Sequence, residues 1–134
     1  MFIRRENFKQ FIKFYPVVSF IIAINLIIYI LTIPSEMREL LFTYGMSVNL
    51  LISNGEWWRV VTSTFLHADF FHVLFNMFSL FLFGPELEKI AGKARFLTIY
   101  LLAGIFGNVF TYLTQDPFYA SVGASGAVYG ILGA

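Results

Sequence analysis

Long apolar stretches separated by polar segments dominate the pattern of hydrophobic and polar positions along the chain. Residues 16–33 (PVVSFIIAINLIIYILTI) hold 18 residues without a charge, and as a helix they would span about 27 Å, one hydrocarbon core. The second stretch, 70–84, is shorter and reaches spanning length only if its helix begins near His67. The third, 96–114, has 19 uncharged residues. The pattern therefore predicts three transmembrane helices.

A fourth apolar stretch begins at Ser121 and runs to the last residue, Ala134. As a helix it would reach only about 21 Å. It would leave unpaired carbonyls and a carboxylate inside hydrocarbon, which bilayers tolerate poorly. We therefore expect a chain truncated inside its fourth transmembrane helix. The expected organisation is a cytoplasmic N-terminal segment, residues 1–15, followed by a partial transmembrane domain, residues 16–134.

The positive charges are unevenly distributed and predict an orientation. Seven of the nine Lys and Arg residues precede the first apolar stretch or lie between the second and third. The segment 34–66, expected to be a loop, carries only Arg38 and Arg59. By the positive-inside rule the N-terminus is cytoplasmic, and this loop and the start of the fourth helix lie on the outer side. Trp57 and Trp58 in the loop suit a membrane–water interface.

The composition is typical of a membrane protein and argues against several other classes. Hydrophobic residues make up 58% and charged residues 13%, whereas soluble domains carry about 25% charged residues. A net charge of +1 without a basic run argues against a nucleic-acid partner. The chain has no cysteine, which removes disulfides and cysteine-based zinc sites. No cofactor or metal is expected, because the spacing of His67 and His72 does not match H-E-x-x-H.

A few polar side chains fall inside the predicted helices, where each is costly and needs a reason. His72 and Asn76 are four residues apart and share one helical face. If the second and fourth helices begin near residues 68 and 122, His72 and Ser125 lie within about one turn of equal depth. A serine, a histidine and an amide at one level can support acyl transfer. From these residues alone His72 would be the general base, and the alternative is hydrogen bonding between helices.

Ser125 lies in the glycine-flanked segment 123–126 (GASG). A serine at a helix N-terminus has free backbone N–H groups beside it, and the glycines would let a substrate backbone approach closely. The alternative is close packing, because Gly126, Gly130 and Ala134 form a small-xxx-small ridge. The G-x-S-x-G elbow of soluble hydrolases does not fit, since the fifth position is alanine and no strand is expected before the serine. A small and polar face of the third helix is also interpreted as packing: Gly104, Gly107, Asn108 and Thr111.

Taken in order, these motifs resemble the rhomboid family of intramembrane serine proteases over residues 16–134. The matching residues are Trp58-Arg59 in the first loop, His67-x4-His72-x3-Asn76, Glu88 and Gly92 after a break at Gly84-Pro85, and Gly123-Ala124-Ser125-Gly126 with Tyr129.

The resemblance implies a role for each matching residue. Ser125 would be the nucleophile, and His72, Asn76 and the Ser125 backbone N–H would bind the oxyanion. His72 is then no longer the base. Tyr129 would stack against a general-base histidine of a sixth helix, which has no counterpart in this chain. Three residues are implied to be structural: Trp58, Arg59 and Glu88.

The expected fold class is therefore an all-α polytopic membrane protein, an incomplete rhomboid-like helix bundle with three transmembrane helices and the start of a fourth. The expected function is an intramembrane serine endopeptidase that cleaves transmembrane segments of membrane proteins. The 134-residue chain would be inactive alone, because the general base is missing. The expected partners are transmembrane substrates and the lipid bilayer of a bacterial plasma membrane. The alternative is a non-catalytic rhomboid-like protein that binds transmembrane helices without cutting them.

Overall fold

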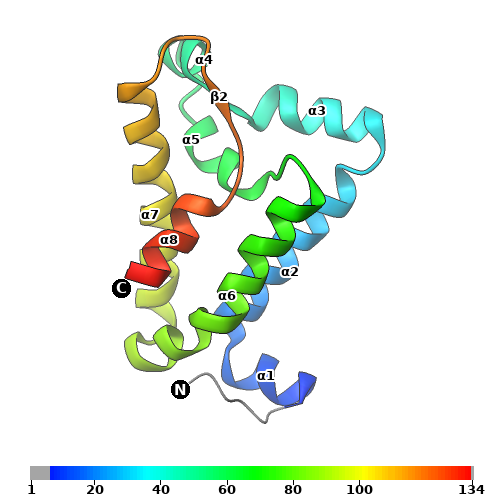
Figure 1. Cartoon of the computed structure of the whole chain (residues 1–134), viewed down its shortest axis with the longest axis vertical. Helices are drawn as coiled ribbons and strands as arrows, with labels where there is room; N and C mark the ends of the chain where they lie inside the picture. Colours follow the sequence, from blue (N-terminus) through cyan, green and yellow to red (C-terminus); the bar gives the residue numbers. More distant parts are fainter. Residues whose placement is uncertain (1–6, 134) are drawn as a thin grey trace.

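Three long helices connect the two ends of the molecule, and most of the shorter elements gather at one end (Figure 1). The computed structural model describes residues 7–133, except for the side chain of Ser125. In chain order the elements are α1 (Phe8–Phe14), α2 (Pro16–Leu31), α3 (Ser35–Gly45), β1 (Ser47–Val48), α4 (Asn49–Ser53), α5 (Arg59–Thr62), the 3-10 helix η1 (Ser63–Phe65), α6 (Phe70–Ala91), α7 (Lys93–Thr114), β2 (Ala120–Ser121) and α8 (Ser125–Gly133).

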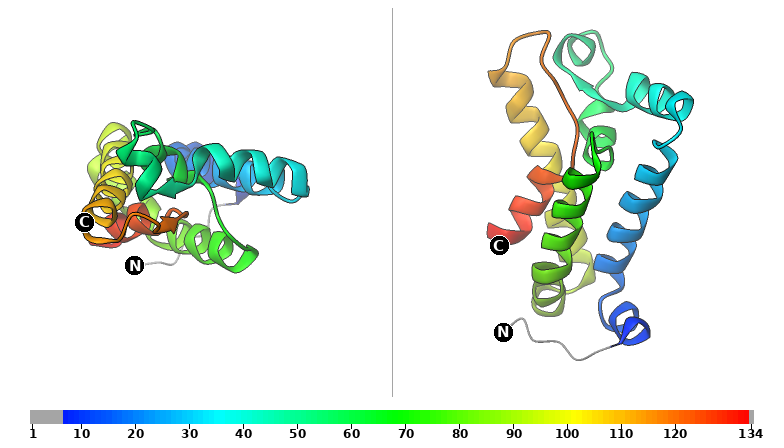
Figure 2. Two further views of the ribbon diagram at one scale, coloured as in Figure 1. Left: turned by 90° about the horizontal axis from the view of Figure 1, so that it is seen from above. Right: turned by 45° about the vertical axis from the view of Figure 1, so that its right-hand side comes forward.

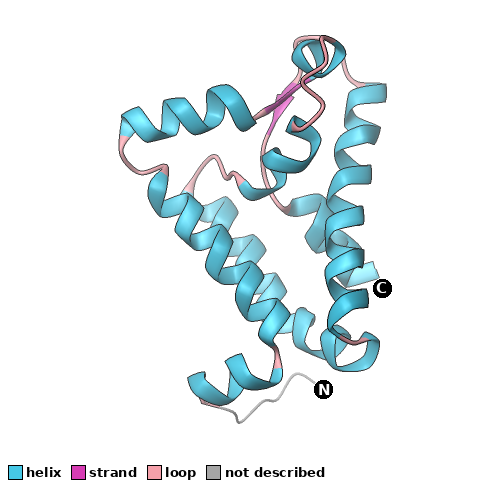
Figure 3. Cartoon of the chain, turned by 180° about the vertical axis from the view of Figure 1, so that it is seen from behind, coloured by secondary structure: helices cyan, strands magenta, loops and turns pink. Residues whose placement is uncertain are grey.

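The long helices agree with a protein that crosses a membrane. Helices α6 and α7 have 22 residues each and are apolar enough to span a bilayer, whereas α1 and α2 satisfy the same criteria only as a pair bent by 112°. The helices predicted over 16–33 and 96–114 are confirmed as α2 and α7, with shifts of two or three residues at one end. The described chain is thus an all-α membrane helix bundle (Figure 3).

The second predicted helix, α6, begins at Phe70 and not near His67, where it would have to begin to reach spanning length by residue 84. The Asp69 side chain accepts a hydrogen bond from the backbone N–H of His72 at 2.9 Å and caps α6. An acceptor at this position pairs one of the N–H groups that a helix leaves free at its start. His67 therefore lies in the loop before the helix.

Helix α6 reaches spanning length because it extends further at its C-terminal end. The prediction of a break at Gly84-Pro85 is therefore wrong. The helix continues through both residues to Ala91. Proline removes one helical hydrogen bond, but a packed neighbour can support the helix through it. A Cβ built at Gly84 would lie 2.9 Å from Cγ2 of Val18, so α2 packs directly against this point of α6.

The fourth helix begins at Ser125, four residues later than Ser121. Residues Ala120 and Ser121 instead form β2, which pairs antiparallel with β1 in the register Ser47↔Ser121. The expectation that no strand precedes the serine is therefore wrong. Gly123 separates the strand from the helix with φ of 125°, a conformation that favours glycine.

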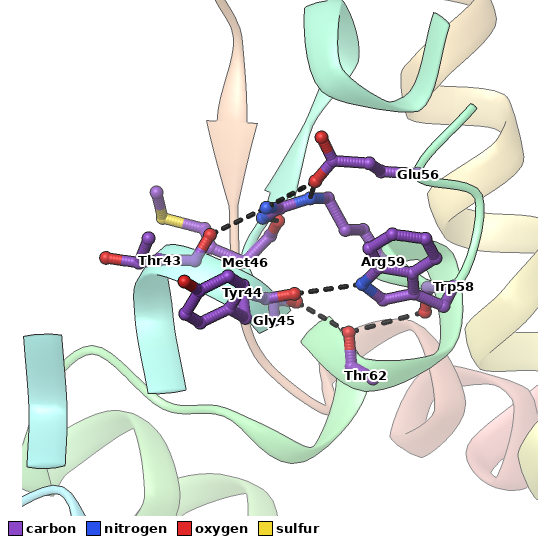
Figure 4. A network of polar contacts seen from close by, with 8 residues as sticks. All are labelled: Thr43, Tyr44, Gly45, Met46, Glu56, Trp58, Arg59 and Thr62. Carbon is purple, nitrogen blue, oxygen red and sulfur yellow. Dashed lines mark hydrogen bonds and ion pairs between the residues drawn. The ribbon is translucent and has the colours of Figure 1, made fainter. Parts of the chain in front are cut away.

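The segment expected to be a loop, 34–66, is instead folded around the buried side chain of Arg59 (Figure 4). The guanidinium donates to the carbonyl oxygens of Thr43 at 2.6 Å and Met46 at 2.8 Å. Its Nε donates to the Glu56 carboxylate at 2.9 Å. Because a helix leaves its last carbonyls unpaired, Arg59 closes the C-terminus of α3 through side-chain donors.

Two neighbours of Arg59 pair the remaining carbonyls of the same turn (Figure 4). The Trp58 indole N–H donates to the Tyr44 carbonyl at 3.0 Å, and the Thr62 hydroxyl donates to the Gly45 carbonyl at 2.7 Å. Four consecutive carbonyls, 43–46, thus have partners from a segment that follows α3 in sequence. The structure gives the Trp58-Arg59 pair a structural explanation.

The junction between α1 and α2 is fixed by a proline and by a distant carboxylate. Residues before proline are biased away from the helical conformation, and Tyr15 adopts φ −129° and ψ 63°. Glu88 of α6 is buried, and its two oxygens accept the backbone N–H groups of Val17 at 3.1 Å and Val18 at 2.9 Å. Glu88 therefore caps α2.

The core lies between α2, α6, α7 and α8 (Figure 2). Its buried hydrophobic residues are Val18, Ile21, Val73, Met77, Leu80, Phe96, Tyr100, Ala124, Ala127, Val128 and Ile131.

Candidate active site

A pocket of about 680 Å³ opens between the first turns of α6 and helix α8. The predicted site residues His72 and Asn76 line it from α6, and Tyr129 lines it from α8. The imidazole of His72 is exposed, whereas Asn76 is 5% exposed. The structure therefore brings these three side chains to one cavity. The remaining lining residues are Asp69, Phe71, Leu74, Phe75 and Phe78.

Asp69 is a residue of this pocket that the sequence interpretation did not use. Its carboxylate caps α6 and also lies 3.5 Å from Nδ1 of His72. Both side chains are largely exposed, so the attraction between them is weak. The pocket is therefore lined partly by polar side chains and partly by the exposed side chains of phenylalanine and leucine residues of α6.

Ser125 is the first residue of α8, and its backbone lies directly after a segment bound to the rest of the protein. The N–H of Gly123 donates to the Ser63 carbonyl at 2.9 Å, and the N–H of Ala124 donates to Nε2 of His67 at 3.3 Å. The Ser125 side chain lies outside the described part of the structure. Two hydrogen bonds from one segment thus fix the backbone that leads into the predicted nucleophile.

His67 is a buried acceptor and has a different environment from His72. Its side chain is 1% exposed. Burial, followed by the nearby charge of protonated His72, lowers the pKa of His67 from its usual 6.5 to about 4. The ring is therefore neutral at pH 7, and its Nε2 accepts the Ala124 N–H. The motif spacing included His67, but sequence reasoning did not assign this contact.

Asn108 of α7 binds the segment 60–63, whose Ser63 carbonyl in turn accepts the N–H of Gly123. Its side-chain amide donates to the Val60 carbonyl at 2.7 Å and to the Ser63 hydroxyl at 3.0 Å. The interpretation of this helix face as a packing surface is confirmed. A polar residue in an apolar stretch was the available sequence signal, but its partners could not be read from it.

The glycine ridge of α8 packs against α7, as the packing alternative predicted. A Cβ at Gly130 would collide with the Cβ of Ala103, and a Cβ at Gly126 would lie 3.6 Å from the Ala103 carbonyl oxygen. Ala134, the third predicted member of the ridge, lies outside the described residues. Helix packing therefore requires glycine at position 130, whereas a Cβ at Gly126 would make only an ordinary van der Waals contact, so packing alone does not explain the second glycine of the GASG segment.

The chemistry available in the pocket comes from a carboxylate, an imidazole, an amide and a phenol. Among the described residues no group of three or more His, Cys, Asp or Glu side chains could hold a metal ion. Amide and imidazole N–H groups are suitable donors to a carbonyl oxygen that gains negative charge. The first N–H groups of α8 lie at the same end of that helix as Ser125 and add a positive dipole end.

Comparison with known proteins agrees with this architecture. The Rhomboid domain family model matches residues 54–134, more than half of the chain. The chain is 48% identical over 134 residues to the rhomboid relative YdcA of Bacillus subtilis (strain 168), covering 99% of this chain and 67% of that protein. It is 43% identical over 100 residues to the rhomboid protease GluP of the same organism, covering 75% of this chain and 19% of GluP. It is 33% identical over 128 residues to rhomboid-like protease 1 of Toxoplasma gondii, covering 86% of this chain and 43% of that protein.

The apolar helices define an integral membrane protein of the polytopic helical class. The chain belongs to the rhomboid family. Membership in this family supports a protease type of function in general. The chain spans about two thirds of YdcA and about a fifth of GluP.

Proposed function

We propose that the chain provides the nucleophile and the oxyanion-binding groups of a rhomboid serine protease. Ser125 is the nucleophile, and His72, Asn76 and the Ser125 backbone N–H bind the oxyanion. The observation that carries the proposal is the pocket that His72 and Asn76 share with Tyr129. Tyr129 lies one helical turn after Ser125 on α8, and residues four apart lie on the same face of a helix.

In the proposed reaction the Ser125 oxygen attacks a peptide carbonyl carbon of a transmembrane segment. The serine proton passes to a general base, and the carbonyl oxygen becomes an oxyanion that the donors stabilise. The C–N bond then breaks, and the amine leaves with a proton. Water hydrolyses the ester, which releases the acid and restores the serine.

The proposed general base is a histidine other than the two in this chain. His67 is buried, and its Nε2 already accepts a backbone N–H. His72 is assigned to the oxyanion by the family resemblance. A serine without a base is a weak nucleophile, so these 134 residues alone are expected to be inactive.

The proposed topology places residues 1–15 in the cytoplasm and the pocket towards the outer face of a bacterial plasma membrane. The support is the position of the described cations of residues 9–13 and 89–95, which lie at the end of the molecule opposite β1 and β2 (Figure 1). Residues 16–134 are proposed to form part of a rhomboid-like transmembrane domain.

Replacing the nucleophile tests the proposal directly. In the natural protein that contains this chain, Ser125→Ala should reduce cleavage of a transmembrane reporter to background, because no oxygen remains to attack the carbonyl. Ser121→Ala, four residues earlier in β2, is the matched control and should retain cleavage. Reporter cleavage is measured by the appearance of the product band in membranes.

A covalent probe separates the enzyme from the non-catalytic alternative. A fluorophosphonate should label the wild-type protein and the Ser121→Ala variant but not Ser125→Ala. Cleavage by Ser125→Ala at the wild-type level would contradict the assignment of Ser125 as the nucleophile. Binding of transmembrane helices without Ser125-dependent labelling would instead support the rhomboid-like binding protein.

A further inference from the structure

A second cavity lies at the end of the molecule opposite β1 and β2, between α1, α2 and α6. It has a volume of about 490 Å³ and is termed the α1 groove. Its walls are apolar apart from two polar residues, Asn7 and Ser19. The other lining residues are Phe8, Phe11, Ile12, Ile22, Ala23, Leu26 and Phe81. The predicted catalytic residues lie outside it.

Helix α1 forms one wall of this groove and is stabilised by a cap at its start and by aromatic contacts. A helix of seven residues is too short to be stable alone in water. Asn7 and Gln10 close its start with a reciprocal capping box, in which each side chain accepts the other residue's backbone N–H at 2.9 and 3.0 Å. The Phe11 ring packs 5.0 Å from that of Phe81 and 5.1 Å from that of Tyr15.

The two faces of α1 differ in chemistry. At helical spacing, Lys9 and Lys13 lie on the polar face. The apolar face carries Phe8, Ile12 and Phe14, which are 81%, 43% and 57% exposed. The 112° bend at the start of α2 turns α1 across the axis of that helix. A short basic amphipathic helix that lies across the spans is typical of a membrane–water interface.

The positive charge at this end of the molecule favours a lipid with an anionic headgroup. Helix α1 and the junction between α6 and α7 lie at this end (Figure 1), and among the described residues they carry five exposed cations: Lys9, Lys13, Lys89, Lys93 and Arg95. The ion pairs within residues 7–133 are Arg59–Glu56 and His72–Asp69. No carboxylate of that range therefore neutralises these cations at ion-pair distance. An anionic headgroup complements this surface.

We propose that the α1 groove binds an acyl chain of an anionic phospholipid of the inner leaflet, with the lipid phosphate against Lys9 and Lys13. The apolar walls accept the chain, and the ammonium groups of Lys9 and Lys13, which follow the groove-lining residues Phe8 and Ile12 in sequence, pair with the phosphate. The bound lipid fixes α1 in the plane of the interface. The inference is independent of the proposed protease function.

Thermal unfolding of the intact protein in phosphatidylcholine micelles, titrated with phosphatidylglycerol, tests this site. A ligand that binds the folded state raises the unfolding midpoint with concentration. The wild-type midpoint should rise with phosphatidylglycerol and remain unchanged with inorganic phosphate. The double variant K9Q/K13Q should lose the rise, because the phosphate contacts are gone. The control K93Q/R95Q removes the same charge from α7 and should retain the rise.

A second variant examines the groove itself. Ala23 lines the groove and is exposed, so Ala23→Phe should fill the groove without disturbing the core and should abolish the phosphatidylglycerol-dependent rise. Native mass spectrometry should show a retained phosphatidylglycerol adduct on the wild type and the control, and none on either groove variant. The proposal is overturned if phosphatidylglycerol does not raise the wild-type midpoint. It is also overturned if K9Q/K13Q or Ala23→Phe retains the full rise.

Discussion

At the scale of single residues, the part of the site that follows local rules was predictable. The pair His72 and Asn76 could be placed on one face by their spacing alone, and both line the pocket. The contact between His67 and Ala124 could not be found in this way, because 57 residues separate the partners. Helical periodicity carries no information about a hydrogen bond between two loops. The same limit applies to Arg59, whose acceptors depend on where α3 ends.

The lowered pKa of His67 predicts a pH-dependent stability. The folded protein holds His67 neutral down to pH about 4, whereas an unfolded chain protonates it near 6.5. Between these values the unfolded state binds more protons, so stability falls as pH decreases. The total loss attributable to this group is about 3 kcal/mol. Unfolding free energy in detergent, measured from pH 7 to pH 4, checks this slope.

A variant isolates the contribution of this residue. His67→Gln retains an acceptor but cannot titrate, so its stability should change less between pH 6.5 and 4 than that of the wild type. His72→Gln removes only the smaller cause of the shift and leaves the burial of His67, so it should retain most of the pH dependence of the wild type. If the wild type and His67→Gln show the same pH dependence, the buried neutral ring is not the cause.

At the scale of elements, hydropathy located the helices but not their ends. The end of α6 was misplaced because Pro85 is usually a helix breaker, and the packing of Gly84 on α2 overrides that preference. The start of α8 was misplaced because Ala120 and Ser121 pair with β1, a partner more than 70 residues away. In contrast, the packing of Gly126 and Gly130 against α7 was correctly interpreted, because it follows from spacing within one helix.

The contact between α7 and α8 leaves no room for a methyl group at Gly130. Gly130→Ala should push α8 away from Ala103 and cost about 1–3 kcal/mol. The double variant A103G/G130A moves the methyl group to the other helix and should recover much of this loss. Thermal unfolding of both variants gives the comparison.

Gly133→Ala provides the control for this pair, because nothing lies within 4 Å of a Cβ at that position. Its stability should match that of the wild type. Equal unfolding midpoints for Gly130→Ala and Gly133→Ala would contradict the close approach of the two helices.

At the scale of the whole molecule, the number of long helices could be predicted from the sequence, whereas the structure of the segment 34–66 could not. Twenty-residue apolar stretches have few alternatives in a bilayer. The folded segment 34–66 has mixed polarity, and its stability comes from contacts such as those of Arg59 and from the β1–β2 pair. Its structure therefore depends on partners that the hydrophobic pattern does not reveal.

Glu88 joins two spans and should be sensitive to substitution. Glu88→Ala leaves the N–H groups of Val17 and Val18 without their acceptor, at about 1–3 kcal/mol for each group that stays unpaired. Glu88→Gln retains one oxygen and should lose less. Glu86→Ala removes a nearby charge as the control. Equal unfolding midpoints for Glu88→Ala and Glu86→Ala would contradict the role of Glu88 as the N-terminal cap of α2.

The contact between Glu88 and α2 also has a consequence for the order of events during synthesis. The first turn of α2 leaves the ribosome early, and its capping carboxylate follows 70 residues later. Until then Tyr15 supplies no side-chain acceptor for that turn. The first span can therefore enter the bilayer at once, but it reaches its final capped state only after the second span has been translated. Release of a nascent chain that stops before Glu88 should leave a first span whose N-terminal turn frays.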